Sequence, residues 1–386
     1  MTGTWWKDEK ELKGEQSALL DYDEDTDLLI QGPPGSGKTN LLLLRANQLF
    51  LGQFPNLHVV VFGSLLKHFI QMGGLQYKFP NDKIITHTRL FNDILLSEGQ
   101  GFDSKGMDIT AARQERANRV EALLKAGKVG KVYEALLLDE AQDFSEQEIR
   151  LLRQLTTVLV GAADRKQAIY RIGGDPVTVL ANCVDEIYPL KFHFRNGREI
   201  CKVADAIYKG KPDYTPMHPS CQYDDTLYPS KVYPKPNLTL QQQAAAIAEQ
   251  VKAQRFAYPD DLIAVLCPRN EELNAIHDEL RKTALEAQLT RANVAGQFDA
   301  SRMIWLSTIS AAKGLEFRAV HIAGLDHLSA TGQVAQKQLI YTGITRAKTA
   351  LSLYWENSIP GYLEAAIRQV APPTAPASKK QIFGKA

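Results

Sequence analysis

Cysteine is scarce in this sequence: its 386 residues include only Cys183, Cys201, Cys221 and Cys267. No two of these cysteines have C-x2-C spacing, and no histidine lies at the spacing of a zinc finger from them. The spacing therefore argues against a zinc site and against a framework of disulfide bonds. Four scattered cysteines are typical of a protein from a reducing cytosol.

Long apolar runs are also missing, since none reaches the roughly 18 residues that a membrane-spanning helix needs. The chain begins with MTGTWWKDEKELKGEQ, which has no apolar core of a signal peptide. We therefore expect a cytoplasmic protein with no membrane partner. An excess of one charge sign is absent as well, because the net charge is +1. That total neither supports nor excludes a nucleic-acid partner, which needs only a local basic groove.

What is present is the composition of a soluble globular protein, with 44% hydrophobic and 23% charged residues. Short apolar runs alternate with helical stretches, an order typical of α/β domains with parallel sheets. The expected strands lie at 28–30, 58–62, 83–86, 135–138, 157–160, 262–266, 303–307, 319–322 and 351–355.

A change of composition after Arg195 divides the chain into two predicted α/β domains. The first covers 1–195, with a short helical insertion at about 92–132, and the second covers 196–368. Residues 369–386 are rich in Pro, Ala and Lys, which predicts a disordered tail. The stretch 209–238 holds many Pro and Tyr residues and is expected to be irregular, as a connector or as a docking surface.

The strongest motif begins directly after the first expected strand, where GPPGSGKT matches G-x4-G-K-[ST] at every fixed position. Glycines let such a turn wrap its backbone N–H groups around phosphate oxygens, and the helix that follows adds its positive end. Lys38 is expected to reach the β- and γ-phosphates, and Thr39 to ligate Mg²⁺. The motif predicts binding of ATP and Mg²⁺ by Gly32, Pro33, Gly35, Ser36, Gly37, Lys38 and Thr39.

An acidic motif follows another buried strand, in the sequence LLLDEAQD at 136–143. Ligands of open α/β sheets bind at the carboxyl edge, which is where this strand delivers its two acids. Asp139 is expected to hold Mg²⁺ together with Thr39. Glu140 is expected to orient and deprotonate the attacking water.

With these motifs in order, residues 12–355 resemble the UvrD/Rep/PcrA-like branch of the superfamily 1 helicases. The resemblance implies two tandem RecA-like P-loop NTPase domains with ATP in the cleft between them. Gln16, in LKGEQ, is similar to the Q-motif residue that reads adenine, and its amide can donate and accept hydrogen bonds together. Gln167, in ADRKQAIY, is similar to the motif III residue that senses the γ-phosphate.

Three later motifs complete the resemblance. FHFR at 192–195 resembles motif IV, which implies that Phe194 stacks on adenine and Arg195 touches the γ-phosphate. TISAAKGLEF at 308–317 resembles motif V, which implies that Gly314 lies close to phosphate and Glu316 binds the ribose. YTGITRAK at 341–348 resembles motif VI, and Arg346 would be an arginine finger, whose planar charge suits the phosphoryl transition state.

The chain also departs from the family at positions implied to contact nucleic acid. Ser310 replaces the usual His of motif V, Ile172 replaces an aromatic residue that stacks on a base, and Ala163 replaces the Gly of motif III. Of the family's two large insertions, only 92–132 remains of the first, and 281–301 is too short for the second. The stretch 85–91 resembles motif Ib weakly and 60–67 resembles motif Ia poorly, so a nucleic-acid role for either stays open.

Two functions therefore remain. The first is an ATP-dependent helicase or translocase on single-stranded DNA, with RNA not excluded. The second is a helicase-like ATPase switch that gates a partner protein, such as a nuclease in a defence or mobile-element system. A small-molecule P-loop kinase is disfavoured because it would not need motifs IV to VI.

Overall fold

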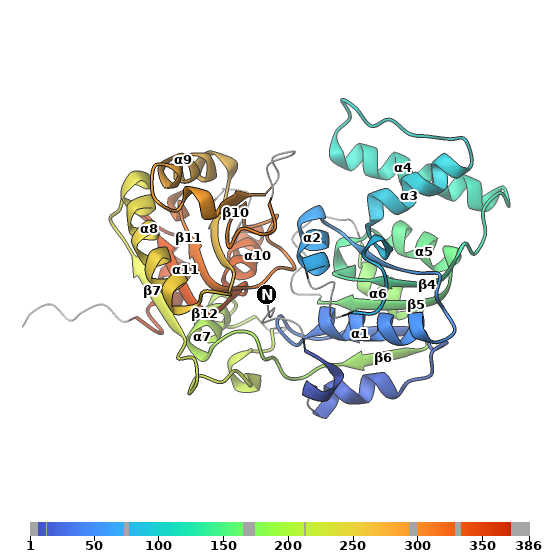
Figure 1. Ribbon diagram of the computed structural model, residues 1–386, viewed down its shortest axis with the longest axis horizontal. Helices are drawn as coiled ribbons and strands as arrows, with labels where there is room; N and C mark the ends of the chain where they lie inside the picture. The colour runs from blue at the N-terminus through green and yellow to red at the C-terminus, as the bar shows by residue number, and fades with distance from the viewer. Residues whose placement is uncertain are drawn as a thin grey trace, which may run out of the picture.

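The computed structural model describes residues 7–12, 14–72, 77–164, 174–211, 214–292, 299–328 and 333–371. Within them the chain forms two six-stranded sheets in which every strand pair is parallel. We call the sheet β1–β6 with helices α1–α6 the first lobe, and β7–β12 with α7–α11 the second lobe; they lie side by side (Figure 1). The prediction of an α/β fold with parallel sheets is confirmed.

The first sheet has the strand order β3-β2-β4-β5-β1-β6. Its central strands are mostly apolar and mostly buried, as expected for a sheet covered on both faces. Their bounds are β1 Leu28–Gln31, β2 Leu57–Val61, β3 Ile84–Thr86, β4 Tyr133–Leu138, β5 Thr156–Ala163 and β6 Glu186–Pro189.

The second sheet has the order β7-β12-β11-β8-β10-β9. Its strands are β7 Lys231–Lys235, β8 Ile263–Cys267, β9 Leu289–Arg291, β10 Ile304–Thr308, β11 Phe317–Ile322 and β12 Ala347–Tyr354.

Helices connect the parallel strands, as right-handed crossovers require. Those of the first lobe are α1 Lys38–Leu51, α2 Ser64–Met72, α3 His87–Ser97, α4 Ile109–Lys125, α5 Glu146–Leu155 and α6 Pro176–Ala181. Those of the second lobe are α7 Arg198–Ile207, α8 Leu240–Ala257, α9 Asn270–Arg281, α10 Gln333–Ile344 and α11 Gly361–Ile367. None of the helices among the described residues is both long enough and apolar enough to cross a membrane.

Residues 92–132, where an insertion was predicted, include the second half of α3, the loop after it and α4; α3 and α4 lie at the upper edge of the first lobe (Figure 1). Helix α4 begins where Asp108 accepts hydrogen bonds from the backbone N–H groups of Thr110 and Ala111, an ordinary N-cap. The insertion is tied to the acidic motif through Arg113, which donates to Asp143 O over 2.8 Å and forms an ion pair with the buried Glu148.

The two lobes share one apolar cluster and several polar contacts. Phe69 of α2 meets Trp305 of β10 edge-on, with ring centroids 6.3 Å apart. Beside them, Lys313 Nζ of the second lobe lies 2.5 Å from Asp143 Oδ1 of the first, and both side chains are buried. The ion pair joins the loop after β4 to the loop after β10, and the ring contact joins α2 to β10, so both hold the first lobe against the second.

Three strands were not predicted from the sequence: β6, β7 and β9, which all lie at the edges of their sheets. An edge strand is short and partly exposed, so it has no continuous apolar run to reveal it. Proline is tolerated at a sheet edge, and Pro189 and Pro234 lie in β6 and β7. The stretch 209–238, expected to be irregular, therefore contains strand β7.

Candidate active site between the lobes

The turn after β1 has two glycines in a left-handed backbone conformation. Gly35 and Gly37 have φ angles of +74° and +89°, in the left-handed region that favours glycine. A Cβ added to Gly35 would lie 2.6 Å from Arg195 Cβ, so this turn and the segment that joins the lobes approach as closely as glycine allows. Helix α1 begins at Lys38, so the free backbone N–H groups of its first turn point toward this turn.

Lys38 and Thr39 occupy the first turn of α1. Lys38 Nζ donates to the backbone oxygens of Gly32 and Pro33 over 2.7 and 2.9 Å, which folds the side chain back across its own loop. Thr39 Oγ1 lies 3.0 Å from Asp139 Oδ2, so the end of β4 and the start of α1 bring a hydroxyl and a carboxylate together. These are the hard oxygen atoms that Mg²⁺ prefers.

Glu140 is held in an uncommon backbone conformation, with φ of +51°. Such a conformation costs about 1–3 kcal/mol in a non-glycine residue and is found where surrounding contacts enforce it. Its carboxylate accepts a hydrogen bond from Gln142 Nε2, and Gln142 Oε1 in turn accepts from Asp164 N over 2.9 Å. The acidic loop is therefore fastened to the end of β5.

The segment 193–197, which joins the lobes, is fastened to both. Phe194 N donates to Gly35 O in the first lobe over 2.9 Å. Asn196 Nδ2 donates to Thr345 O and Ala347 O in the second lobe over 2.9 and 2.6 Å. Because Arg195 lies between these anchors, its position depends on how the lobes are placed.

Arg195 belongs to a group of three charged side chains, each 12–14% exposed, that spans the join. Its Nε lies 2.5 Å from Glu316 Oε2, and Lys348 Nζ lies 2.9 Å from Glu316 Oε1. Gly314, two residues before Glu316, has φ of +80°, and a Cβ there would meet Leu66 Cδ2 of α2 at 2.8 Å. The motif V segment thus packs directly on the first lobe.

Arg346 is 1% exposed and lies between α10 and β12. It donates to Thr342 O, Leu315 O and Thr345 Oγ1 over 3.0–3.3 Å. These contacts fix the plane of the guanidinium. Arg195 and Glu140 act on it electrostatically, as expected if it faces the same cleft.

Two adjoining hollows of about 530 and 500 Å³, including the part open to solvent, lie between these groups. The first is lined from both lobes, by Lys38, Thr39, Asp139, Glu140, Arg195, Gly314 and Glu316 among others. The second is lined by Lys7, Gln16, Gly35, Gly37, Asn40, Phe194, Arg195, Glu316 and Lys348.

Gln16 lies at the base of the second hollow and is 3% exposed. Its Nε2 donates to Ser36 O over 2.9 Å, and its Oε1 is buried with no hydrogen-bond partner among the described residues. A buried acceptor without a donor costs about 1–3 kcal/mol. An incoming N–H group would remove that cost.

Burial and mutual charge shift the pKa values of these groups. Burial lowers the pKa of Lys38, although Asp164 and Glu140 oppose the shift. Burial raises the pKa of Asp139, and the neighbouring Glu140 adds to the rise. Burial alone would raise the pKa of Glu140. The nearby cations Lys313, Arg346 and Lys38 have a larger opposite effect, so the pKa of Glu140 is lowered. Asp139 is therefore harder to ionise than an exposed aspartate, whereas Glu140 stays ionised.

Glu316 gives a prediction about stability. Burial acts to raise its pKa, but Lys348 and Arg195 lower it to about 2 from a usual 4.5. A carboxylate whose pKa is lowered on folding stabilises the fold above pH 4.5, and this stabilisation is lost as the pH falls toward 2. We expect Glu316→Gln to lower the free energy of unfolding by about 2–3 kcal/mol at pH 7 and by clearly less at pH 3.

Denaturant titrations of both proteins at the two pH values test this expectation. Glu364→Gln is the matched control, because its pair with Arg368 is 51–56% exposed and should contribute little at either pH. An equal loss of stability for Glu316→Gln at pH 7 and pH 3 would contradict the assignment of the ion pair.

The structure thus brings together the predicted residues that it describes: Gln16, Gly32, Pro33, Gly35, Ser36, Gly37, Lys38, Thr39, Asp139, Glu140, Phe194, Arg195, Gly314, Glu316 and Arg346. Gln167 and Ile172 lie outside the described residues. Whether these residues bind nucleotide and Mg²⁺ stays a prediction, as do the domain boundaries.

Sequence analysis assigned no role to Asp143, Lys313, Lys348, Lys7 or Asn40, which all lie at the hollows or bridge the lobes. Three of them are within quoted motifs: Asp143 ends DEAQD, Lys313 begins KGLEF and Lys348 ends TRAK. The motifs could therefore have drawn attention to these positions, although only the fold shows that Asp143 and Lys313 pair.

Comparison with known proteins gives one family match. Residues 303–354 match the family model of the UvrD-like helicase C-terminal domain. Within this span lie β10, the motif V segment, Arg346 and β12. The match confirms the resemblance to UvrD-like superfamily 1 helicases in the second lobe.

Among solved structures, the chain is similar to the C-terminal domain of a possible DNA helicase from Lactobacillus plantarum WCFS1. The two are 20% identical, the alignment covers 46% of this chain and 96% of the other, and the TM-score is 0.34. No curated protein matches the chain.

Proposed function

Because residues 303–354 match the UvrD-like helicase C-terminal domain, we propose that this chain is an ATPase that couples hydrolysis of Mg-ATP to movement along single-stranded DNA. One observation carries the proposal. The glycine-rich turn and the acid pair of the first lobe meet Glu316 of the second lobe around two adjoining hollows, with Arg195 at the join. Arg346 of the second lobe acts electrostatically on Glu140. Because both lobes contribute residues to one site, binding of ATP there would draw the lobes together.

The residues present fit a nucleoside triphosphate and Mg²⁺. The turn at Gly35 and Gly37 is a backbone cradle for phosphate, and Lys38 would exchange its contacts with Gly32 O and Pro33 O for phosphate oxygens. Thr39 and Asp139 would hold the ion between them. Bound there, Mg²⁺ neutralises charge on the phosphate oxygens.

Adenine would lie in the second hollow. Gln16 Oε1, which has no partner among the described residues, would accept a hydrogen bond from the exocyclic amine of adenine. The Phe194 ring lines the same hollow, with Lys7 Nζ 5.1 Å from its centroid, and offers a face for stacking. Guanine presents a carbonyl oxygen at that amine's position, so this arrangement favours ATP over GTP.

We expect Gln16→Ala to reduce the preference for ATP over GTP by about tenfold, the equivalent of one lost hydrogen bond. Competition binding with a fluorescent ATP analogue measures the preference. Gln114→Ala, on the exposed face of α4, is the control and should leave it unchanged. An unaltered preference in Gln16→Ala would show that this residue does not read the base.

In the chemical step, Glu140 would orient the attacking water and accept its proton, since its neighbours keep it ionised. Arg195 and Arg346 would face the negative charge that spreads over the transferred phosphoryl group. Both depend on the lobe arrangement, because the join is anchored to Gly35 O on one side and to Thr345 O on the other. Hydrolysis would thus be coupled to the angle between the lobes.

A third hollow suggests how a single strand could influence this step. It lies between α2 and the motif V segment and is lined by Phe62, Gly63, Ser64, Leu65, Leu66, Glu140, Asp143, Ser310, Ala311 and Lys313. Glu140 is common to this hollow and to the phosphate hollow. A strand seated here would touch the Asp143–Lys313 pair and so change the surroundings of the general base.

Steady-state ATP hydrolysis with and without single-stranded DNA or RNA tests the proposal, with Lys38→Ala as the blank. We expect stimulation of at least about tenfold, equivalent to about 1.4 kcal/mol of coupling. Hydrolysis that is indifferent to nucleic acid would contradict translocation. That result would favour an ATPase switch acting on a partner protein, and the reduced insertion and Ser310 would then be features of that role.

A further inference from the structure

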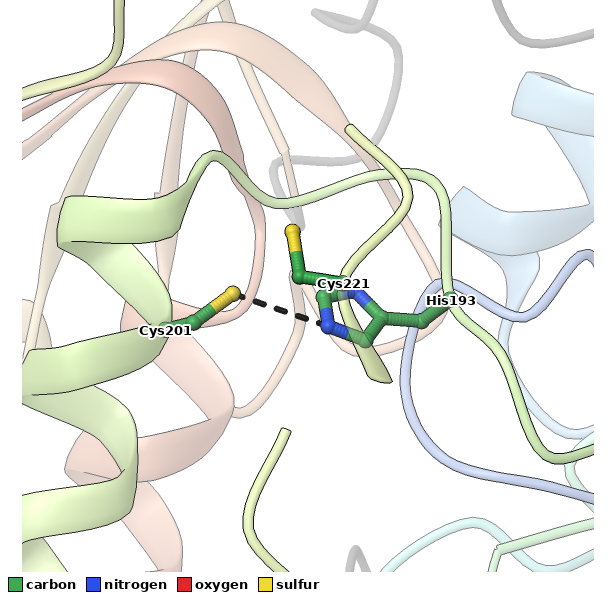
Figure 2. A group of neighbouring side chains, drawn as sticks. All are labelled: His193, Cys201 and Cys221. Atoms are coloured by element: carbon green, nitrogen blue, oxygen red, sulfur yellow. Dashed lines mark hydrogen bonds between the residues drawn. The ribbon is translucent and has the colours of Figure 1, made fainter. Parts of the chain in front are cut away.

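Three potential metal ligands outside the ATP site lie together in the second lobe, although the chain separates them. His193 precedes Phe194 at the join, Cys201 lies on α7, and Cys221 follows a short turn at 218–220. One ligand atom from each lies within 4.8 Å of those of the other two (Figure 2). Their exposed fractions are 0, 0 and 3%.

The hydrogen bonds around the cluster leave it incompletely satisfied. The Sγ atoms of Cys201 and Cys221 each lie 3.3 Å from Asn196 O. His193 Nε2 lies 2.9 Å from Met217 O and 3.7 Å from Cys201 Sγ. His193 Nδ1 is buried with no hydrogen-bond partner among the described residues. A buried imidazole nitrogen that no donor satisfies calls for a ligand.

The spacing of these atoms suits a four-coordinate metal ion. Metal–sulfur bonds of about 2.3 Å and metal–nitrogen bonds of about 2.0 Å in tetrahedral geometry place neighbouring ligand atoms about 3.5–3.8 Å apart. Each of the three side chains offers a ligand atom within 4.8 Å of those of the other two, and Asn196 O lies 3.3 Å from both sulfurs. Because His193 Nε2 donates to Met217 O, the unpartnered Nδ1 is the imidazole nitrogen available to an ion.

We propose that His193, Cys201 and Cys221 form a site for a thiolate-binding divalent ion of the zinc class, with Asn196 O or a water molecule as the fourth ligand. Two thiolates and an imidazole select zinc over Mg²⁺, which prefers oxygen ligands. A Cys201–Cys221 disulfide is the weaker alternative, because it would use both sulfurs and leave the imidazole nitrogen without a partner.

The site has a consequence for the join between the lobes. His193 pairs with Cys221 as an isolated parallel β-bridge, and Gln222 N donates to His193 O over 2.9 Å. A bound ion would add a link from this bridge to α7. Since Phe194 and Arg195 follow His193 directly, the ion would hold the backbone of both residues against the second lobe.

The expectation from sequence that zinc is absent depended on spacing along the chain. The ligands come from three segments separated by 8 and 20 residues, as Cys201 follows His193 and Cys221 follows Cys201. No short motif describes such a set, and only the fold brings it together.

Titration of the full-length, metal-free chain with Co²⁺ tests the site, in a thiol-free reductant and with excess Mg²⁺. We expect one Co²⁺ per chain, with a thiolate-to-cobalt charge-transfer band and the strong visible bands of four-coordinate Co²⁺, both displaced by Zn²⁺. Oxygen ligands at the ATP site cannot give a thiolate band, so the signal is independent of ATP hydrolysis.

Cys201→Ser and Cys221→Ser should each weaken Co²⁺ binding at least about tenfold and lower the charge-transfer band. Cys183→Ser, which changes a half-buried cysteine outside the cluster, is the matched control and should bind as the wild type does. Circular dichroism checks that each variant is folded, and Cys201→Ala and Cys221→Ala replace any serine variant that is not.

Two results would overturn the proposal. One is wild-type protein that gives no thiolate–cobalt band, or gives a band that the variants retain. The other, from mass spectrometry of protein purified without reductant, is a Cys201–Cys221 disulfide in a chain that still binds no Co²⁺ after reduction. Neither result bears on ATP hydrolysis, so this proposal and the proposed function can fail separately.

Discussion

Lys38→Ala is expected to reduce ATP hydrolysis by roughly 10²–10³-fold, because it removes a preorganised cation from the phosphate cradle. In the structure Lys38 Nζ donates to Gly32 O and Pro33 O, two neutral backbone acceptors that phosphate oxygens would replace. Steady-state phosphate release, with and without single-stranded DNA, measures the effect.

Lys38→Arg separates charge from shape in this prediction. Arginine keeps the positive charge, but its planar fork does not fit a loop whose glycines leave room for one compact ammonium group. We expect it to be impaired nearly as much as Lys38→Ala. Lys252→Ala, on the exposed face of α8, is the control for loss of a lysine and should hydrolyse ATP at the wild-type rate. Hydrolysis by Lys38→Ala above a tenth of the wild-type rate would contradict the role of this residue.

Arg346→Ala is expected to lower kcat by about 10³-fold, the effect typical of a lost arginine finger. Nucleotide binding should change little, because most contacts with the nucleotide come from the first lobe and the join. The loss would then appear in kcat with little change in the dissociation constant for Mg-ATP, which is the signature of an interaction made mainly in the transition state. Equilibrium binding and single-turnover hydrolysis separate the two quantities.

The control for Arg346 must address its structural contacts, since it donates to Thr342 O and Leu315 O in the second lobe. Arg346→Lys keeps a charge at the cleft without the planar fork, and Arg368→Ala removes an exposed arginine. Compared with Arg346→Ala, Arg346→Lys should restore any lost stability of the fold, but kcat should stay close to that of Arg346→Ala. If Arg346→Ala binds no nucleotide while remaining folded, the residue is part of the binding site and its role as a finger is wrong.

The local parts of the candidate site were accessible from sequence because each is a short motif tied to a strand end. GPPGSGKT follows a fully apolar strand, so the position of Lys38 at the start of a helix could be predicted. DEAQD likewise follows β4, and parallel strands deliver such loops to the same edge of a sheet. The buried strands were predicted for the same reason, since their apolar runs are continuous.

The relations between lobes were not accessible, because they depend on distances that no local pattern encodes. The Asp143–Lys313 pair joins residues 170 positions apart, and the Arg195–Glu316 pair joins residues 121 apart. The edge strands β6, β7 and β9 lacked an apolar run because one side of each faces no neighbouring strand. The His193–Cys201–Cys221 cluster was missed because its three members come from three segments.

The central claim is that ATP lies between the lobes and is cleaved by groups from both. A crystal structure with Mg²⁺ and a non-hydrolysable ATP analogue measures this directly. The account predicts a γ-phosphate within hydrogen-bond distance of Lys38 Nζ on one side and of the Arg195 or Arg346 guanidinium on the other, with the ion held by Thr39 and Asp139. A nucleotide bound elsewhere, or one that leaves both arginines more than one water molecule away, would contradict it.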